Sequence, residues 1–326
     1  MKPSLEVRIG SLRLRNPVLV ASGIIGYGRE YERLVPLEKI GGIVTKTVTL
    51  RARAGNPPPR VYETASGLLN SIGIENPGLD GFLESKAPIL RDLPCAAIVS
   101  IEGEDVGEFC ELVRGVDASG VAHAIEVNIS CPNVGPHGLR YSTDAGMARE
   151  VMGAIRPLTQ LPLIAKLTPN VTRIAEIAEA CEECGADAIS LVNTFIGMAV
   201  DTRTRKPILG TVLGGLSGPA IKPHALAKTW EVVQAVDIPV VGMGGITRPS
   251  DSVEFLLLGA VAIQVGTALF SDPGLPVACV EEIETYLARM KASSIDDLIG
   301  ALEVPEGRGI IRAGRAVRRE HGGRAS

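Results

Sequence analysis

The chain alternates short apolar runs with segments of mixed polarity. Eight runs rich in Val, Ile and Ala are apolar at nearly every position, as expected for a parallel sheet that is covered on both faces. They span residues 17–22, 42–47, 96–101, 124–129, 162–167, 187–192, 238–243 and 261–266. Between them, segments such as 144–158, 171–185 and 223–236 place apolar residues three and four apart, the spacing of amphipathic helices. This order predicts an α/β fold of the (β/α)8 TIM-barrel type.

Three other segments complete the predicted barrel. Residues 5–17 alternate on either side of Gly10 and Ser11, which predicts an N-terminal β-hairpin that closes the bottom of the barrel. The connections 48–80 and 194–220 are much longer than usual, and long connections in a compact domain commonly serve a site. Both follow strands, so we expect them as active-site loops on the C-terminal rim.

The end of the chain differs in composition from the rest. Residues 304–326 contain six Arg against two Glu, together with five Gly. We therefore expect one barrel domain over residues 1–303 and a disordered Arg/Gly-rich tail over 304–326, with anion binding by the tail as the alternative.

Charge and composition narrow the classes of partner. The formal net charge is −4, so the chain lacks the basic footprint of a nucleic-acid-binding protein. It has no apolar leader and no uninterrupted apolar run of about 18 residues, and we expect a cytoplasmic protein without membrane association. Six scattered cysteines do not form a disulfide pattern. Cys181 and Cys184 lack a second pair, so helix packing is favoured over zinc and no metal is expected.

Polar residues recur where the predicted strands end. Since the carboxyl ends of parallel strands meet at one mouth of a barrel, these side chains should converge there. They are Ser22, Lys46, Ser100, Asn128, Lys166 and Asn193. A lysine at the end of an apolar strand requires an anionic partner. A structural ion pair could explain one lysine, but two lysines and two asparagines together favour a ligand.

Glycine-rich turns follow the last two predicted strands, at residues 242–246 and 266–270. In TIM barrels these two connections often bind a phosphate group through backbone N–H groups. Gly244, Gly245, Gly266 and Thr267 suit that role, and Gly218 lies in a third glycine-rich segment. A phosphorylated flavin, FMN, would also explain Lys166, which could stabilise negative charge on the reduced ring. A Schiff-base aldolase with a lysine nucleophile is the chemical alternative.

A series of motifs resembles those of the dihydroorotate dehydrogenase family. In order, they are NPVLVASG, KTVT, GNPPPRVYET, LNSIGIENPG, NISCPN, KLTPN, LVNT, GGLSGPAIKP, GMGGI and GTALF. The resemblance covers about residues 5–300 and is highly specific. It implies an FMN-binding (β/α)8 barrel, with one FMN per chain.

The resemblance also implies residue roles. Amide side chains would bind the pyrimidine substrate, because each amide offers both a donor and an acceptor. The implied substrate-binding residues are Lys46, Asn70, Asn128, Asn133, Asn193 and Thr194, with the backbone N–H groups of Ile72, Gly73 and Ile74 receiving the carboxylate. The implied cofactor-binding residues are Ala21, Ser22, Lys46, Thr47, Ser100, Asn128, Lys166, Val192, Gly218, Met243, Gly244, Gly245, Gly266 and Thr267.

Cys131 is the implied general base in this family pattern, with Lys46 and Lys166 as further catalytic residues. The expected reaction is oxidation of (S)-dihydroorotate to orotate in the de novo synthesis of UMP. Cys131 would take the C5 proton while hydride leaves C6 for N5 of FMN, and the loop after it would close over the ring. A free thiol has a pKa near 8.5, so activity should rise toward alkaline pH unless the site lowers that value.

The electron acceptor is a separate question. The cysteine base and the motifs around residues 55–64 and 214–223 are similar to those of class 1B. That class passes electrons to NAD through a partner subunit with FAD and a [2Fe-2S] cluster, in a heterotetramer around a catalytic homodimer. The alternatives are class 1A, a fumarate-dependent homodimer, and a related flavin-dependent pyrimidine reductase. A non-catalytic barrel that binds a phosphorylated ligand is the alternative outside enzymology.

Overall fold

A closed barrel of eight parallel strands forms the centre of the molecule in a computed structural model that describes residues 2–130 and 143–305. Around the barrel the strand order is β10-β15-β16-β3-β4-β7-β8-β9. The strands are β3 (Val18–Val20), β4 (Gly42–Val44), β7 (Ala96–Ile101), β8 (Ala124–Asn128), β9 (Leu163–Lys166), β10 (Ala188–Leu191), β15 (Val240–Met243) and β16 (Ala262–Val265). Each lies within one of the eight predicted apolar runs, so the predicted (β/α)8 barrel is confirmed.

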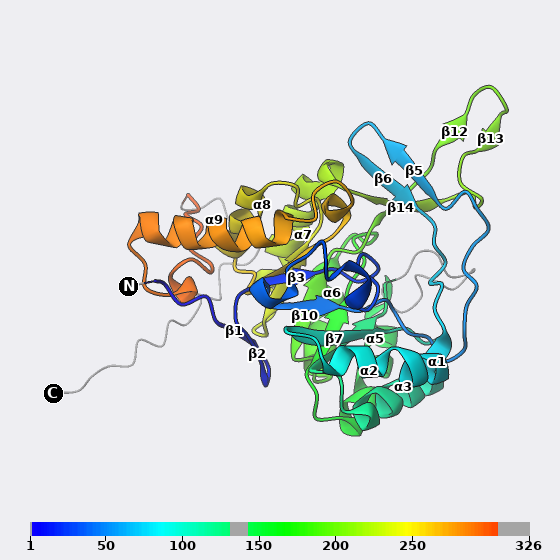
Figure 1. Ribbon diagram of the computed structural model, residues 1–326, viewed down its shortest axis with the longest axis horizontal. Helices are drawn as coiled ribbons and strands as arrows, with labels where there is room; N and C mark the ends of the chain where they lie inside the picture. The colour runs from blue at the N-terminus through cyan, green and yellow to red at the C-terminus, as the bar shows by residue number, and fades with distance from the viewer. Residues whose placement is uncertain (1, 131–142, 306–326) are drawn as a thin grey trace.

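Helices cover the outside of this barrel (Figure 1). They are α1 (Gly78–Ser85), α2 (Ala87–Arg91), α3 (Val106–Ser119), α5 (Ala145–Ile155), α6 (Ile174–Glu183), α7 (Lys222–Val233), α8 (Pro249–Leu258) and α9 (Leu275–Met290). Local sequence sets several of their ends: the Asp105 side chain accepts a hydrogen bond from the Glu108 N–H, and α3 ends at Gly120 in the left-handed region. Strand residues such as Ile98 and Ile125 are fully buried beneath the helices, which explains why the strands are apolar on both faces.

The predicted N-terminal hairpin is confirmed as β1 (Val7–Ile9) and β2 (Leu12–Leu14), which pair antiparallel. Gly10 forms its tip with a φ of 56°, a conformation that glycine adopts at little cost. A Cβ there would lie 3.2 Å from the Asp187 carboxylate. Asp187 directly precedes β10, so the hairpin lies at the N-terminal end of the barrel, as predicted.

The two long connections pair with each other on the rim. The first contains β5 (Val61–Thr64) and β6 (Gly67–Asn70), and the second contains β11 (Phe195–Gly197) and β14 (Gly214–Ser217). Together they form an antiparallel sheet in the order β11-β14-β6-β5, which we call the rim sheet. It lies beyond the barrel at the upper right of Figure 1, next to the small β12 (Val200–Asp201) and β13 (Lys206–Pro207) ribbon. The sequence predicted two site loops but not that they pair.

Two other predictions concern the chain as a whole. Among residues 2–130 and 143–305, no helix is both long enough and apolar enough to cross a bilayer. Cytoplasmic location stays a prediction. Residues 306–326 lie outside the described part of the chain, so the expected domain boundary and disordered tail stay predictions too.

Replacing Gly67 by alanine should separate β6 from β14. The added methyl group would lie 2.1 Å from the carbonyl oxygen of Ser217, and the backbone shift that relieves the clash costs about 1–3 kcal/mol. This cost falls on the rim sheet and not on the barrel core. Amide hydrogen exchange should accelerate in β6 and β14, while the thermal unfolding midpoint changes little.

Gly153→Ala provides the control for this substitution. Its Cβ would lie 4.0 Å from the nearest heavy atom, the sulfur of Cys184, on an exposed position of α5. Alanine should stabilise that helix by about 0.5–1 kcal/mol. Unchanged exchange in β6 and β14 of the Gly67 variant would contradict the prediction.

Candidate active site

A cavity of about 630 Å³, including the part open to solvent, lies at the C-terminal mouth of the barrel. Ten predicted cofactor-binding residues line it: Ala21, Ser22, Lys166, Val192, Gly218, Met243, Gly244, Gly245, Gly266 and Thr267. Two predicted substrate-binding residues, Asn193 and Thr194, line it as well. The structure thus brings together residues at or just beyond the C-terminal ends of five barrel strands, and Gly218 just beyond β14.

A chain of hydroxyl groups joins three of the predicted residues behind this cavity. The Ser22 hydroxyl donates to the Thr45 carbonyl at 2.7 Å and lies 3.3 Å from the Thr47 hydroxyl. The Thr47 hydroxyl lies 3.0 Å from that of Ser100. Thr47 and Ser100 are buried and do not line the cavity. Their hydroxyl groups support Ser22, which does line it. Lys46 lies close by, because a Cβ on Gly23 would be 3.9 Å from its Nζ.

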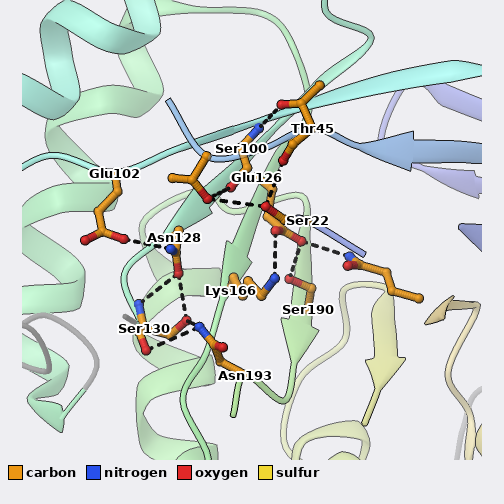
Figure 2. A network of polar contacts seen from close by, with 12 residues as sticks. Ser22, Thr45, Ser100, Glu102, Glu126, Asn128, Ser130, Lys166, Ser190 and Asn193 are labelled. Atoms are coloured by element: carbon orange, nitrogen blue, oxygen red, sulfur yellow. Dashed lines mark hydrogen bonds and ion pairs between the residues drawn. The ribbon is translucent and has the colours of Figure 1, made fainter. Parts of the chain in front are cut away.

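Lys166 forms an ion pair inside the barrel. Its Nζ lies 3.1 Å from Oε1 of Glu126, whose side chain is fully buried, and Lys166 still lines the cavity. The sequence left open that one of the two lysines forms a structural ion pair. Lys166 does so, and it also lines the cavity. Figure 2 shows this pair within a wider polar network. Glu126 was missed in the sequence, although a charged residue within an apolar strand was a detectable signal.

Two of the predicted amides are fixed by a serine between them (Figure 2). The Asn128 Oδ1 accepts a hydrogen bond from the Ser130 hydroxyl at 2.8 Å, and the Asn193 Nδ2 donates to that hydroxyl at 2.8 Å. The Asn128 Nδ2 donates to the Glu102 carboxylate at 2.7 Å. Neither Ser130 nor Glu102 was predicted. These contacts fix the orientation of both amides, which keeps their donors and acceptors in set directions.

The rim sheet brings Asn70 next to Thr194. The Asn70 Nδ2 donates to the Gly215 carbonyl at 3.2 Å, and a Cβ on Gly215 would lie 2.1 Å from the Thr194 hydroxyl. Residues 72–74 lie in the same connection, outside any helix or strand, with Gly73 and Ile74 at positive φ. Asn70 and this segment lie outside the cavity lining described above. Their predicted contact with a substrate carboxylate is therefore an untested prediction.

The glycine turn after β15 is held by an aspartate. Gly244 and Gly245 have positive φ, and a Cβ on Gly245 would lie 2.6 Å from the backbone nitrogen of Lys222. Asp251 accepts hydrogen bonds from the N–H groups of Thr247 and Arg248 at 2.8 and 2.9 Å, and from the Lys222 ammonium at 2.7 Å. Burial opposes ionisation of Asp251, but these hydrogen bonds outweigh it and hold its pKa below the usual value.

The turn after β16 closes the other side of this region. Thr267 begins a 3-10 helix, η6 (Thr267–Phe270), and α9 starts at Leu275. The Thr267 hydroxyl donates to that of Ser217 at 2.8 Å, next to Gly218 at a φ of 95°. Three glycine-rich segments therefore meet at one side of the cavity. Backbone exposed without side chains suits a phosphate group, so the residues present fit FMN.

Cysteine chemistry is the remaining prediction. Cys131 and Asn133 lie outside the described residues, so the structure places neither. Burial raises the pKa of Cys181 and Cys279 to about 12 and that of Cys95 to about 11, which leaves these thiols protonated and unreactive.

The mouth of this TIM barrel therefore combines glycine turns, a buried lysine and fixed amides around one cavity. Comparison with known proteins specifies the family. The family model for dihydroorotate dehydrogenase matches residues 4–287. The chain therefore belongs to the dihydroorotate dehydrogenase family, whose members are oxidoreductases.

Curated relatives agree over nearly the whole chain. A protein of Trichlorobacter lovleyi is 52% identical over 303 residues, which is 93% of this chain and 100% of that protein. Proteins of Geobacter sulfurreducens and Geotalea daltonii are 50% and 49% identical, each over 93% of this chain and 99% of the relative. All three are named dihydroorotate dehydrogenase B (NAD(+)), catalytic subunit.

Asp251→Ala should destabilise the protein by about 2–3 kcal/mol at pH 7, because it leaves two backbone N–H groups without their acceptor and removes the more deeply buried of the two carboxylates that bind Lys222. A carboxylate with a depressed pKa stabilises the fold fully above its ordinary pKa, and this contribution is lost as the pH falls through the depressed value. The difference between the variant and the wild type should therefore shrink in acid. Urea denaturation from pH 7 down to pH 3 measures it.

Glu254→Ala is the matched control. Glu254 binds the same Lys222 ammonium at 2.7 Å, but its side chain is 42% exposed, so its loss should cost less than about 1 kcal/mol. Equal costs for the two variants at pH 7 would show that Asp251 does not hold the turn.

Proposed function

We propose that this chain oxidises (S)-dihydroorotate to orotate in de novo pyrimidine synthesis, with FMN as its own cofactor. The observation that carries the proposal is the meeting of three glycine-rich segments, the Lys166 ammonium and the fixed amides at one barrel mouth. The family membership and the names of the relatives support the same substrate.

The residues present divide into a cofactor side and a substrate side. Gly218, Gly244, Gly245, Gly266 and Thr267 would hold the FMN phosphate through backbone N–H groups. Ser22, with the hydroxyl chain behind it, and Lys166 would face the ring. FMN bound there would supply the acceptor for hydride leaving C6 of the substrate.

On the substrate side, Asn128 and Asn193 would orient the pyrimidine ring through its amide groups, joined by Asn70, Asn133, Thr194 and Lys46. Cys131 would take the proton from C5 as its thiolate. As that C–H bond breaks and hydride leaves C6, the C5–C6 double bond of orotate forms, so protons and electrons balance. Closure of the segment after Cys131 would exclude water from the reacting ring.

We further infer the NAD-dependent type of enzyme, located in the cytoplasm. A partner subunit with FAD and a [2Fe-2S] cluster would carry electrons to NAD, in a heterotetramer around a homodimer of this chain. The printed names of the relatives support this choice, since they specify NAD(+) and a catalytic subunit.

Replacing Cys131 tests the chemistry. In anaerobic stopped-flow experiments, dihydroorotate should bleach the flavin of the wild type, with a rate that rises with pH as the thiol ionises. Cys131→Ala should lower this rate about 10²–10⁴-fold, the usual contribution of a general base, and Cys131→Ser should move the pH profile to higher pH.

Cys110→Ala is the control thiol variant, because Cys110 lies on α3 and makes only a weak contact at 3.9 Å with the Ala154 carbonyl. It should keep the wild-type rate. A flavin that stays oxidised with dihydroorotate would overturn the substrate assignment.

The electron acceptor is tested by purifying the tagged chain from its native cells. A co-purifying subunit with FAD and acid-labile sulfide, and dihydroorotate-dependent reduction of NAD by the complex, are expected. Fumarate-dependent turnover by the isolated chain would instead support the stand-alone class 1A enzyme. Absence of both activities would overturn the class assignment.

A further inference from the structure

A buried carboxylate lies inside the barrel and binds three side chains from other strands. Oε1 of Glu126, on β8, faces the ammonium of Lys166 on β9 at 3.1 Å. Its Oε2 accepts hydrogen bonds from the Ser190 hydroxyl on β10 at 3.1 Å and from Nε2 of Gln264 on β16 at 2.8 Å. Glu126, Lys166 and Ser190 are labelled in Figure 2. We call these four residues the Glu126 cluster.

The carboxylate fixes which way the Gln264 amide points. A carboxylate only accepts hydrogen bonds, so the NH₂ group of Gln264 must face it. The carbonyl oxygen, Oε1, then points away from Glu126. Gln264 is 1% exposed, and its Oε1 has no hydrogen-bond partner among the residues that the structure describes. A buried acceptor without a donor is costly, and Gln264 lines the active-site cavity.

The chemistry of this orphaned acceptor indicates its partner. It calls for a donor from a molecule in the cavity, which Lys166, whose ammonium is itself a donor, also lines. An acceptor beside a donor complements a ring N–H beside a ring carbonyl. The oxidised isoalloxazine ring of a flavin has one ring N–H, N3, flanked by two carbonyl groups.

We propose that Gln264 is a flavin-binding residue whose Oε1 accepts a hydrogen bond from N3–H of FMN. Glu126 is the positioning residue: it orients the Gln264 amide through Oε2 and holds the Lys166 ammonium through Oε1. The inference rests on the proposed function only in taking FMN as the cofactor. Gln264, inside the barrel, would therefore recognise the pyrimidine edge of the flavin.

The test compares FMN with 3-methyl-FMN, in which a methyl group replaces the N3 hydrogen. The full chain is freed of flavin, and the two dissociation constants are measured by fluorescence titration. The wild type should bind FMN at least about tenfold more tightly, because the methylated ring leaves Oε1 buried without a donor. Gln264→Leu, of similar volume but without an acceptor, should reduce this preference to less than about threefold.

Two variants of the Glu126 cluster separate the roles of its members. Glu126→Gln removes the constraint on the Gln264 amide and should weaken the preference for FMN. Ser190→Ala removes a different hydrogen bond to the same Oε2 and should keep the preference. Circular dichroism and melting temperature check that each variant folds. If Gln264→Leu does not fold, Gln264→Met, which also lacks the amide acceptor, takes its place.

The outcomes are distinct from those for the proposed function. A wild type that binds neither flavin would overturn FMN as the cofactor and the proposed function with it. A wild type that binds both flavins equally would overturn only the inference, since Oε1 would then be satisfied by water. The same preference in wild type and Gln264→Leu would also overturn it, because the methyl group would be excluded by shape alone.

Discussion

A charge enclosed in a closed barrel must be neutralised, and this constraint organises the candidate active site. Transfer of the Glu126 carboxylate out of water is expensive unless a cation and hydrogen-bond donors replace its hydration. Lys166, Ser190 and Gln264 replace it from three other strands. The same contacts therefore determine where a cation and an acceptor face the cavity.

Next to the Glu126 cluster, another part of the site depends on close approach of backbone segments at glycine residues. The turn after β15 passes so close to Lys222 that residue 245 has room only for glycine. Asp251 then ties that turn to α8 through hydrogen bonds to two N–H groups and to Lys222. The proposed phosphate site would be built from such turns, whose backbone N–H groups need no side chain to approach the ligand.

The substrate side has a different construction. The rim sheet joins two connections that are more than a hundred residues apart, and the Asn70–Gly215 and Leu69–Leu216 pairs hold them in register. Asn70 and Thr194 both lie against Gly215 only because of this pairing. Ser130 similarly connects Asn128 and Asn193 from strands that are not neighbours in the barrel. In the proposed function, cofactor binding would thus depend mainly on the glycine-rich turns, whereas substrate recognition would depend on contacts between distant segments.

The sequence by itself determined the barrel, the hairpin at its base and most residues that line the cavity. The barrel and the polar residues at its mouth follow from local rules: an apolar run marks a strand covered on both faces, and a polar residue at its end reaches the mouth. Other cavity residues, such as Ala21, Val192 and Met243, were expected only from the resemblance to a family. Only the tertiary structure decided the rim sheet, the Ser130 bridge and the partners of Glu126 and Gln264. Each of these depends on which segments meet when the barrel closes, and no local pattern encodes the pairing of a buried polar atom with a group on another strand.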